Sequence, residues 1–171
     1  MTWGRMKKKL ESVYLCSILR GRIQYFVTSY SKCPDHEGRA AIRLDGKEVI
    51  KSSYYEYWIK EYVASQKIDI QYGELSISER RKKIHNIILE DGGFDQTCFY
   101  VAFKEFDNQS IEKSIISENP IVRVMAILDK RIGKRRLVSI KDEILIQPKW
   151  IQFFYNLRVE AEGIKCLNSK E

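Results

Sequence analysis

Lysine and arginine side chains are the residues whose type and spacing could do chemistry in this sequence, and they are densest at residues 129–136. A glycine directly after a strongly apolar segment is surrounded by five cations: Lys130, Arg131, Lys134, Arg135 and Arg136. Such side chains bind phosphate and carboxylate groups, so the segment predicts an anion-binding surface. A helix C-terminus also favours cations, so a purely structural role is the alternative. The segment lacks the glycine and the Ser or Thr of a phosphate loop.

The positive charge of the chain is concentrated in two segments that are distant in sequence. The 171 residues contain 30 Lys and Arg against 23 Asp and Glu, a net charge of +7. Residues 1–30 hold six cations and one carboxylate, and residues 121–151 hold eight cations and three carboxylates. An anionic partner would be favoured if both segments shared one face of the fold. The candidate anion-binding residues are Arg22, Arg39, Lys130, Arg131, Lys134, Arg135 and Arg136.

A second pattern would carry metal chemistry. Pro34-Asp35, followed by Asp45-Gly46-Lys47, satisfies the PD…(D/E)xK pattern of a large nuclease superfamily. In that chemistry two carboxylates hold Mg²⁺ and a lysine lies near the attacking water. Asp35, Glu37 and Asp45 are the candidate ligands of this alternative. Asp45-Gly46 is also typical of a hairpin tip, whereas the pattern needs its second carboxylate within a strand, so we expect no resident metal.

Other kinds of site have little support in the sequence. The four cysteines, Cys16, Cys33, Cys98 and Cys166, are scattered without a C-x-x-C pair, which favours reduced thiols. Dinucleotide-binding and phosphate-loop motifs are absent, so no cofactor is expected. No apolar run approaches the roughly 18 residues of a membrane helix, and the N-terminus lacks the apolar segment of a secretory signal. We therefore expect a cytoplasmic protein without a membrane partner.

Local patterns in the N-terminal half predict the elements that would position these side chains. Apolar residues recur at helical spacing over residues 3–13, and residues 21–30 are rich in aromatic and β-branched types. Asp45-Gly46 between two strand-like runs is a strong hairpin signal, because both positions of a type I′ turn need positive φ. The sequence therefore predicts a helix, a three-stranded antiparallel meander over about 22–52, and a further helix from residue 54.

The helical pattern lapses around residues 66–73, which are the best candidate for a linker. Ser76 or Ser78 can cap the next helix, and Gly92-Gly93 can end it. Residues 94–106 fit either a helix or a strand.

A buried helix is predicted to start at Asn119-Pro120 and to end at Gly133. The sequence does not decide the secondary structure of residues 137–146, and a last helix is expected from Pro148 to Gly163. The fold class is therefore α+β: an N-terminal helix, a three-stranded antiparallel meander and a helix, followed by a mostly helical C-terminal half. We expect one domain over residues 1–171, with 1–65 and 74–164 as its α+β and helical parts.

Several short strings near both ends of the chain occur together in one known family. They are Trp3 with Lys8-Lys9-Leu10-Glu11; Gly21-Arg22 with Tyr25; Gly38-Arg39 with Asp45-Gly46-Lys47-Glu48-Val49; Leu128-Asp129-Lys130-Arg131 with Gly133-Lys134-Arg135; and Phe154-Tyr155 with Leu157-Arg158 and Ala161-Glu162-Gly163-Ile164. The chain thereby resembles a family of small bacterial proteins that are conserved but uncharacterised. The resemblance skips about residues 53–118. It implies a bacterial cytosolic origin and adds no activity, cofactor or catalytic residue.

We expect a non-enzymatic cytosolic binding protein whose basic surface meets an anionic partner, either a nucleic acid or an acidic protein. A metal-dependent hydrolase or nuclease that uses the turn carboxylates is one alternative. A structural or oligomeric module is another. The sequence leaves the identity of the partner and the oligomeric state open.

Overall fold

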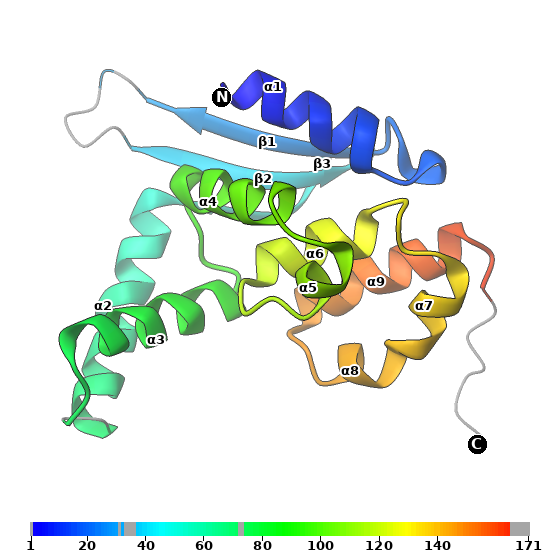
Figure 1. Cartoon of the computed structure of the whole chain (residues 1–171). Helices are drawn as coiled ribbons and strands as arrows, with labels where there is room; N and C mark the ends of the chain where they lie inside the picture. The colour runs from blue at the N-terminus through cyan, green and yellow to red at the C-terminus, as the bar shows by residue number, and fades with distance from the viewer. Residues whose placement is uncertain (1, 31, 33–36, 72–73, 165–171) are drawn as a thin grey trace.

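The computed structural model describes residues 2–30, 32, 37–71 and 74–164, and it places one small sheet over a group of helices (Figure 1). The strands are β1 Ile23–Ser29, β2 Gly38–Leu44 and β3 Lys47–Ser53. The helices are α1 Trp3–Lys8, α2 Tyr54–Gln71, α3 Ile77–Glu90, α4 Gln96–Asp107, α5 Ile111–Ile115, α6 Pro120–Leu128, α7 Lys134–Ser139, α8 Lys141–Leu145 and α9 Lys149–Ala161. This is the predicted α+β fold, with a helix, a meander and a mostly helical remainder.

The sheet is antiparallel, with the order β1-β2-β3. The predicted hairpin is confirmed at the tip between β2 and β3, where Asp45 has φ of 50° and Gly46 has φ of 81°. Both positions of a type I′ turn need positive φ, which is why Asp-Gly forms this tip. Strands β1 and β2 pair from Ile23 with Leu44 to Ser29 with Gly38. The predicted turn at 34–38 lies mostly outside the described residues.

The N-terminal helix protects the free edge of the sheet. Helix α1 continues into a π-helical turn over Lys9–Tyr14, where one longer regular helix was predicted. Glu11 of this turn accepts a hydrogen bond from the backbone N–H of Tyr25, with Oε1 at 2.7 Å from the nitrogen. An unpaired strand edge can pair with another chain, so a carboxylate that occupies one of its donors opposes that pairing.

The prediction of a linker at residues 66–73 is wrong for residues 66–71, which are helical. Helix α2 continues through this stretch because Ala64 and Ile68 pack against Ile84 and Ile88 of α3. These four residues form a small apolar cluster of their own, which the helical pattern around Gln66 did not reveal. Residues 72–73 lie outside the described part.

Capping residues fix the starts of three later helices. Of the two predicted caps, Ser76 and Ser78, it is Ser76 that begins α3, and it forms a reciprocal capping box with Glu79. Asp95 caps α4, which settles residues 94–106 as helical over most of their length. Asn119 caps α6 by accepting from the backbone N–H of Ile121, and Pro120 occupies the first turn, again as predicted.

The prediction that α6 ends at Gly133 is wrong. The helix ends at Leu128, and Asp129 is already extended, with φ of −74° and ψ of 138°. The reason is tertiary, because Asp129 forms a β-bridge with Leu15 and the backbone N–H of Lys130 donates to the carbonyl oxygen of Tyr14. Gly133 instead precedes α7. The last helix ends near the predicted place, where Gly163 has φ of 64°.

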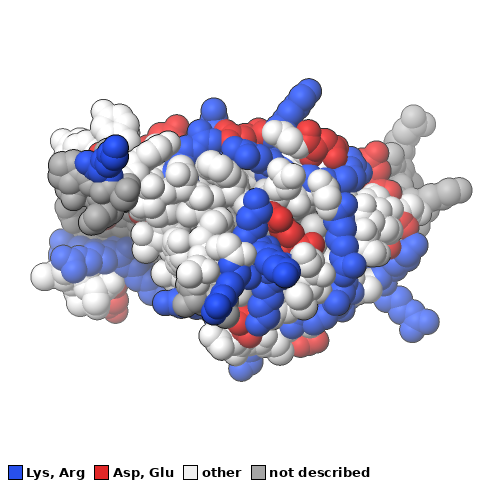
Figure 2. All heavy atoms as spheres, turned by 90° about the horizontal axis from the view of Figure 1, so that it is seen from above, with Lys and Arg blue, Asp and Glu red and all other residues white. Residues whose placement is uncertain are grey.

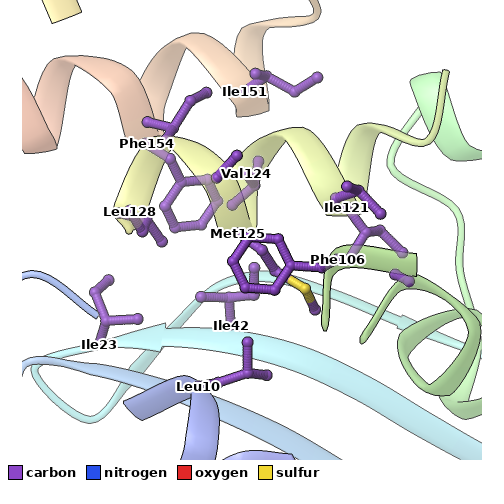
Figure 3. Packing of buried hydrophobic residues seen from close by; sticks show 14 of the residues in the cluster. Leu10, Ile23, Ile42, Phe106, Ile121, Val124, Met125, Leu128, Ile151 and Phe154 are labelled. Carbon is purple, nitrogen blue, oxygen red and sulfur yellow. The ribbon is translucent and has the colours of Figure 1, made fainter. Parts of the chain in front are cut away.

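One large apolar core joins the sheet to the C-terminal helices (Figure 3). Helix α6 lies at its centre and is buried on all sides. Leu10, Ile23 and Ile42 contribute from the N-terminal part, and Met125 and Phe154 contribute from α6 and α9. This core fills the inner face of the sheet, so the charged side chains of Arg39, Arg43 and Glu48 lie on the outer face, whereas Ser52 is buried and accepts a hydrogen bond from the Phe94 N–H.

Candidate functional site

The outer face of the sheet carries two arginines on one aromatic ring. Alternation along β2 sends Ala40 and Ile42 into the core and turns Arg39 and Arg43 outwards. The guanidinium carbon of Arg43 lies 4.0 Å from the centroid of the Phe26 ring, and that of Arg39 lies 5.3 Å from it. Cations at these distances are attracted by the ring face, so Phe26 fixes the position of both.

A single carboxylate links the two arginines. Glu48 of β3 accepts from Nη2 of Arg43 at 3.0 Å and also from Nη2 of Arg39. A β-bulge makes this possible, because the register shifts between Ile42 and Arg43 and brings Glu48 opposite Arg43. The hydrogen bond from Arg43 and the charges of both arginines hold the pKa of Glu48 below its usual value.

A shallow hollow lies next to this group, where β3 meets the start of α2. It has a volume of about 170 Å³ and is lined by Arg39, Lys51, Ser52, Ser53 and Glu56. Ser53 and Glu56 cap each other reciprocally, since the Ser53 N–H donates to Glu56 at 2.8 Å and the Glu56 N–H donates to Ser53 Oγ at 3.2 Å. Lys51 is exposed.

We call Phe26, Arg39, Arg43, Glu48 and Lys51 the sheet-face cluster. Figure 2 views the molecule from the side of the sheet and α1, and it shows Lys and Arg side chains spread over this face with carboxylates between them. The arrangement can hold an anion between cations whose positions are set by a strand, a bulge and an aromatic ring.

Arg22 lies elsewhere on the sheet, at the hairpin tip. It forms a bidentate pair with Asp45, with Nε at 3.0 Å and Nη2 at 2.9 Å from the two carboxylate oxygens. This hydrogen bonding lowers the pKa of Asp45. Arg22 is therefore placed to steady the turn, and its charge is shared with a carboxylate.

Arg131 is held by a buried carboxylate in the loop after α6. The side chain of Asp129 is fully buried and accepts from the backbone N–H, Nε and Nη2 of Arg131 at 2.7, 3.0 and 2.8 Å. The guanidinium of Arg131 also lies over the rings of Tyr14 and Phe106, at 4.8 and 5.3 Å. Through these contacts Arg131 connects the loop to the N-terminal segment, which is a structural role.

Arg158 of α9 fastens the same loop from the other side. Its Nη1 donates to the carbonyl oxygens of Leu128 and Asp129 at 3.0 and 3.1 Å, and its Nη2 donates to that of Ile132 at 3.1 Å. Glu162 pairs with it at 2.9 Å. We call the residues from Asp129 to Gly133, together with Arg158, the loop cluster.

The other basic candidates are dispersed around α7. Lys134 donates from Nζ to the carbonyl oxygen of Glu162 at 2.6 Å. Arg136 and Arg131 line a hollow of about 220 Å³ together with Glu112. Lys130 and Arg135 are exposed. The hollow lined by Arg39 and the hollow lined by Arg131 and Arg136 have no lining residue in common.

Sequence reasoning did not single out Arg43, Lys51 or Arg158 as members of a site. Alternation in β2 could have found Arg43, because it stands four residues after Arg39 and therefore on the same face of a strand. Lys51 required the register of β3, and the role of Arg158 required the packing of α9 on the loop.

The two described carboxylates of the metal alternative are far apart. Glu37 immediately precedes β2 and Asp45 immediately follows it, which separates them by about 25 Å at the usual rise of a strand. Asp45 lies in the turn and is paired with Arg22. Asp35 lies outside the described residues. Within the described ranges, no group of three His, Cys, Asp or Glu residues is placed to hold a metal ion.

The chain matches a sequence model of the SF0329 protein family over residues 2–159, which is most of its length. The chain belongs to the SF0329 protein family. No curated protein and no protein of solved structure matches it. The match includes the sheet-face cluster, the loop cluster and the middle region that the resemblance skipped. In the part of the chain that the structure describes, no helix has the length and apolar character needed to cross a membrane.

Proposed function

We propose that the protein binds a nucleic-acid strand through its phosphates on the outer face of the sheet, without a chemical reaction. The observation that carries this proposal is the pair of guanidinium groups over Phe26, with Lys51 beside them at the edge of a hollow. Arginine presents several N–H donors in a planar fork that matches phosphate oxygens, and lysine adds a point charge.

The cations of this cluster keep donors for a ligand. Within the described residues, Arg39 and Arg43 each donate to Glu48 through Nη2 alone, and Lys51 forms no ion pair. Glu48 sets the positions of both guanidinium groups and balances one of the three positive charges. An anion that approaches the hollow therefore meets preset donors and remaining positive charge.

A planar stacking surface favours a nucleic acid over an acidic protein. Unpaired bases stack on guanidinium planes and aromatic rings, which a carboxylate side chain does not do. The net charge of +7 supports the same class of partner. We place this activity in the bacterial cytoplasm, which agrees with the free thiols of Cys16 and Cys98.

The experiment that tests the proposal is fluorescence anisotropy with labelled single-stranded and duplex oligonucleotides over about 50 to 200 mM salt. Three phosphate contacts to a single strand predict a slope of log affinity against log salt of about −2. Lys51→Glu should weaken binding and reduce the magnitude of this slope.

Lys104→Glu is the matched control, because it makes the same charge change at an exposed position on α4, which packs against the inner face of the sheet. The control should bind like the parent. Equal losses in both variants would overturn the sheet face as the site. Binding to polyglutamate without binding to any oligonucleotide would overturn the nucleic acid as the partner.

A further inference from the structure

Helix α2 presents a continuous apolar stripe to solvent. Tyr55, Trp58, Ile59, Tyr62 and Val63 follow the helical spacing of one face. The exposed fraction is 62% for Tyr55, 53% for Trp58 and 62% for Tyr62. The rings of Tyr55 and Trp58 are stacked, with centroids 6.3 Å apart. Large aromatic side chains gathered on one exposed face are typical of a protein–protein interface.

The stripe is not needed for the packing of the chain itself. The opposite face of α2 carries Ala64 and Ile68, which pack on α3, and Tyr57, whose hydroxyl lies 2.7 Å from Nδ1 of His85. Figure 1 shows α2 and α3 side by side, reaching away from the rest of the molecule on the side opposite α7 and α9. The stripe is therefore accessible to another molecule.

The stripe is complementary to a second copy of itself that runs in the opposite direction. When two copies of α2 run antiparallel with their centre between Lys60 and Glu61, Trp58 comes opposite Val63 and Ile59 comes opposite Tyr62. The rings of Trp58 and Tyr62 then each meet a smaller aliphatic side chain, which is the arrangement that interdigitates well, and Tyr55 comes opposite Gln66 at the end of the stripe. A two-fold axis through this centre makes the same patch serve both subunits.

The charges beside the stripe favour the same orientation. Glu56 and Lys67 are eleven residues apart, three helical turns, so they lie on one flank near opposite ends of the stripe. Antiparallel pairing brings Glu56 of each copy towards Lys67 of the other, whereas parallel pairing places these flanks on opposite sides of the interface and leaves both charges without that partner. Within the described residues, Lys67 forms no ion pair.

We propose that the protein is a dimer in which α2 pairs antiparallel with α2 of a second copy. A groove of about 360 Å³ borders the stripe between α2 and α3, with apolar walls that include Ile59, Val63 and Ile87. An aromatic ring from the second copy can enter this groove at the margin of the interface. This proposal does not rest on the sheet-face cluster.

The test is sedimentation equilibrium of the full chain over a range of concentrations. The parent should approach twice the chain mass of 20.2 kDa. Trp58→Glu places a charge in the stripe and should give a monomer. Ile146→Glu is the matched control, because Ile146 is 85% exposed on another part of the surface, and it should leave the dimer intact.

The orientation is tested by exchanging the charges. Lys67→Glu should weaken the dimer at least several-fold, and adding Glu56→Lys to it should restore much of the affinity. Circular dichroism checks that each variant keeps its helices. A parent that stays monomeric at all concentrations, or a Trp58→Glu variant that still forms dimers, would overturn the proposal. Glu56→Lys alone measures what loss of the hydrogen bonds to Ser53 costs, and a double variant that shows no gain beyond the sum of the two single changes would overturn the antiparallel orientation.

Discussion

The sheet-face cluster and the loop cluster both pair two arginines with carboxylates and aromatic rings, yet they use the charge differently. On the sheet, the side chains of Arg39 and Arg43 stay 30% and 29% exposed around one shared Glu48. In the loop, Arg158 is 3% exposed and donates to backbone carbonyl groups. Arg131 is 36% exposed, but its Nε and Nη2 both donate to the fully buried Asp129. The most basic stretch of the sequence therefore commits part of its charge to the fold. Charge density in a sequence does not reveal how much charge is available to a partner.

The largest expected effect is the loss of Arg158. Arg158→Met removes donors from three buried carbonyl oxygens and the ion pair of Arg158 with Glu162, so the free energy of unfolding should fall by about 3–5 kcal/mol. Arg43→Met on the sheet face should cost less than about 1 kcal/mol, because that group is partly hydrated. Urea denaturation of both variants measures the difference. Equal losses of unfolding free energy in the two variants would contradict the view that Arg158 is structural and that Arg43 is an accessible cation.

A smaller effect is expected from acid on the sheet face. The pKa of Glu48 is lower in the folded protein than its usual value of 4.5, chiefly through the hydrogen bond from Arg43. The stabilisation from this group is thus present above about pH 4.5 and is lost as the pH falls through the lowered pKa. Glu48→Gln should remove that part of the pH dependence.

This prediction is checked by the free energy of unfolding at neutral pH and near pH 3. The stability gap between the parent and Glu48→Gln should narrow towards the acidic end, with an amplitude under about 1 kcal/mol. A gap that stays constant with pH would show that Glu48 acts through its shape and not through its charge.

The smallest effect is expected at the hairpin tip. Arg22 and Asp45 form an exposed pair, so Arg22→Gln should leave the thermal midpoint unchanged within measurement error. The same variant should not alter oligonucleotide affinity beyond the general effect of one charge, which Lys104→Glu calibrates. A selective loss of binding in Arg22→Gln would extend the proposed surface along the sheet to its hairpin end.

Features that depend on neighbouring residues could be predicted from the sequence. The Asp45-Gly46 turn, the Ser76 cap and the Asn119-Pro120 start each follow from the conformation or hydrogen bonding of a few adjacent residues. The meander followed from the aromatic and β-branched residues of 21–30 and from the strand-like runs on both sides of that turn. These signals depend on a few adjacent residues, so they can be recognised in the sequence before the rest of the fold is known.

Features set by distant contacts could not be predicted in this way. Helix α6 stops at Leu128 because Asp129 meets the N-terminal segment, which overrides the stop signal of Gly133. The sheet-face cluster depends on a bulge that aligns Glu48 with Arg43, and a bulge shifts register without a clear mark in composition. Arg131 and Arg135 are both exposed, and only the tertiary structure shows that Arg131 is bonded to the buried carboxylate of Asp129.

The fastening of the loop cluster has a consequence for how the chain folds. Tyr14 near one end and Arg158 near the other both close onto the loop that follows α6. Closing these two long loops costs chain entropy before the hydrogen bonds form, so the cluster is expected to be completed late, after α6 and α9 have met. Removing the N-terminal segment would take away the acceptor of the Lys130 N–H, and removing α9 would take the Arg158 donors from three carbonyl oxygens. We therefore expect native structure around this loop only once the chain has been synthesised at least as far as α9.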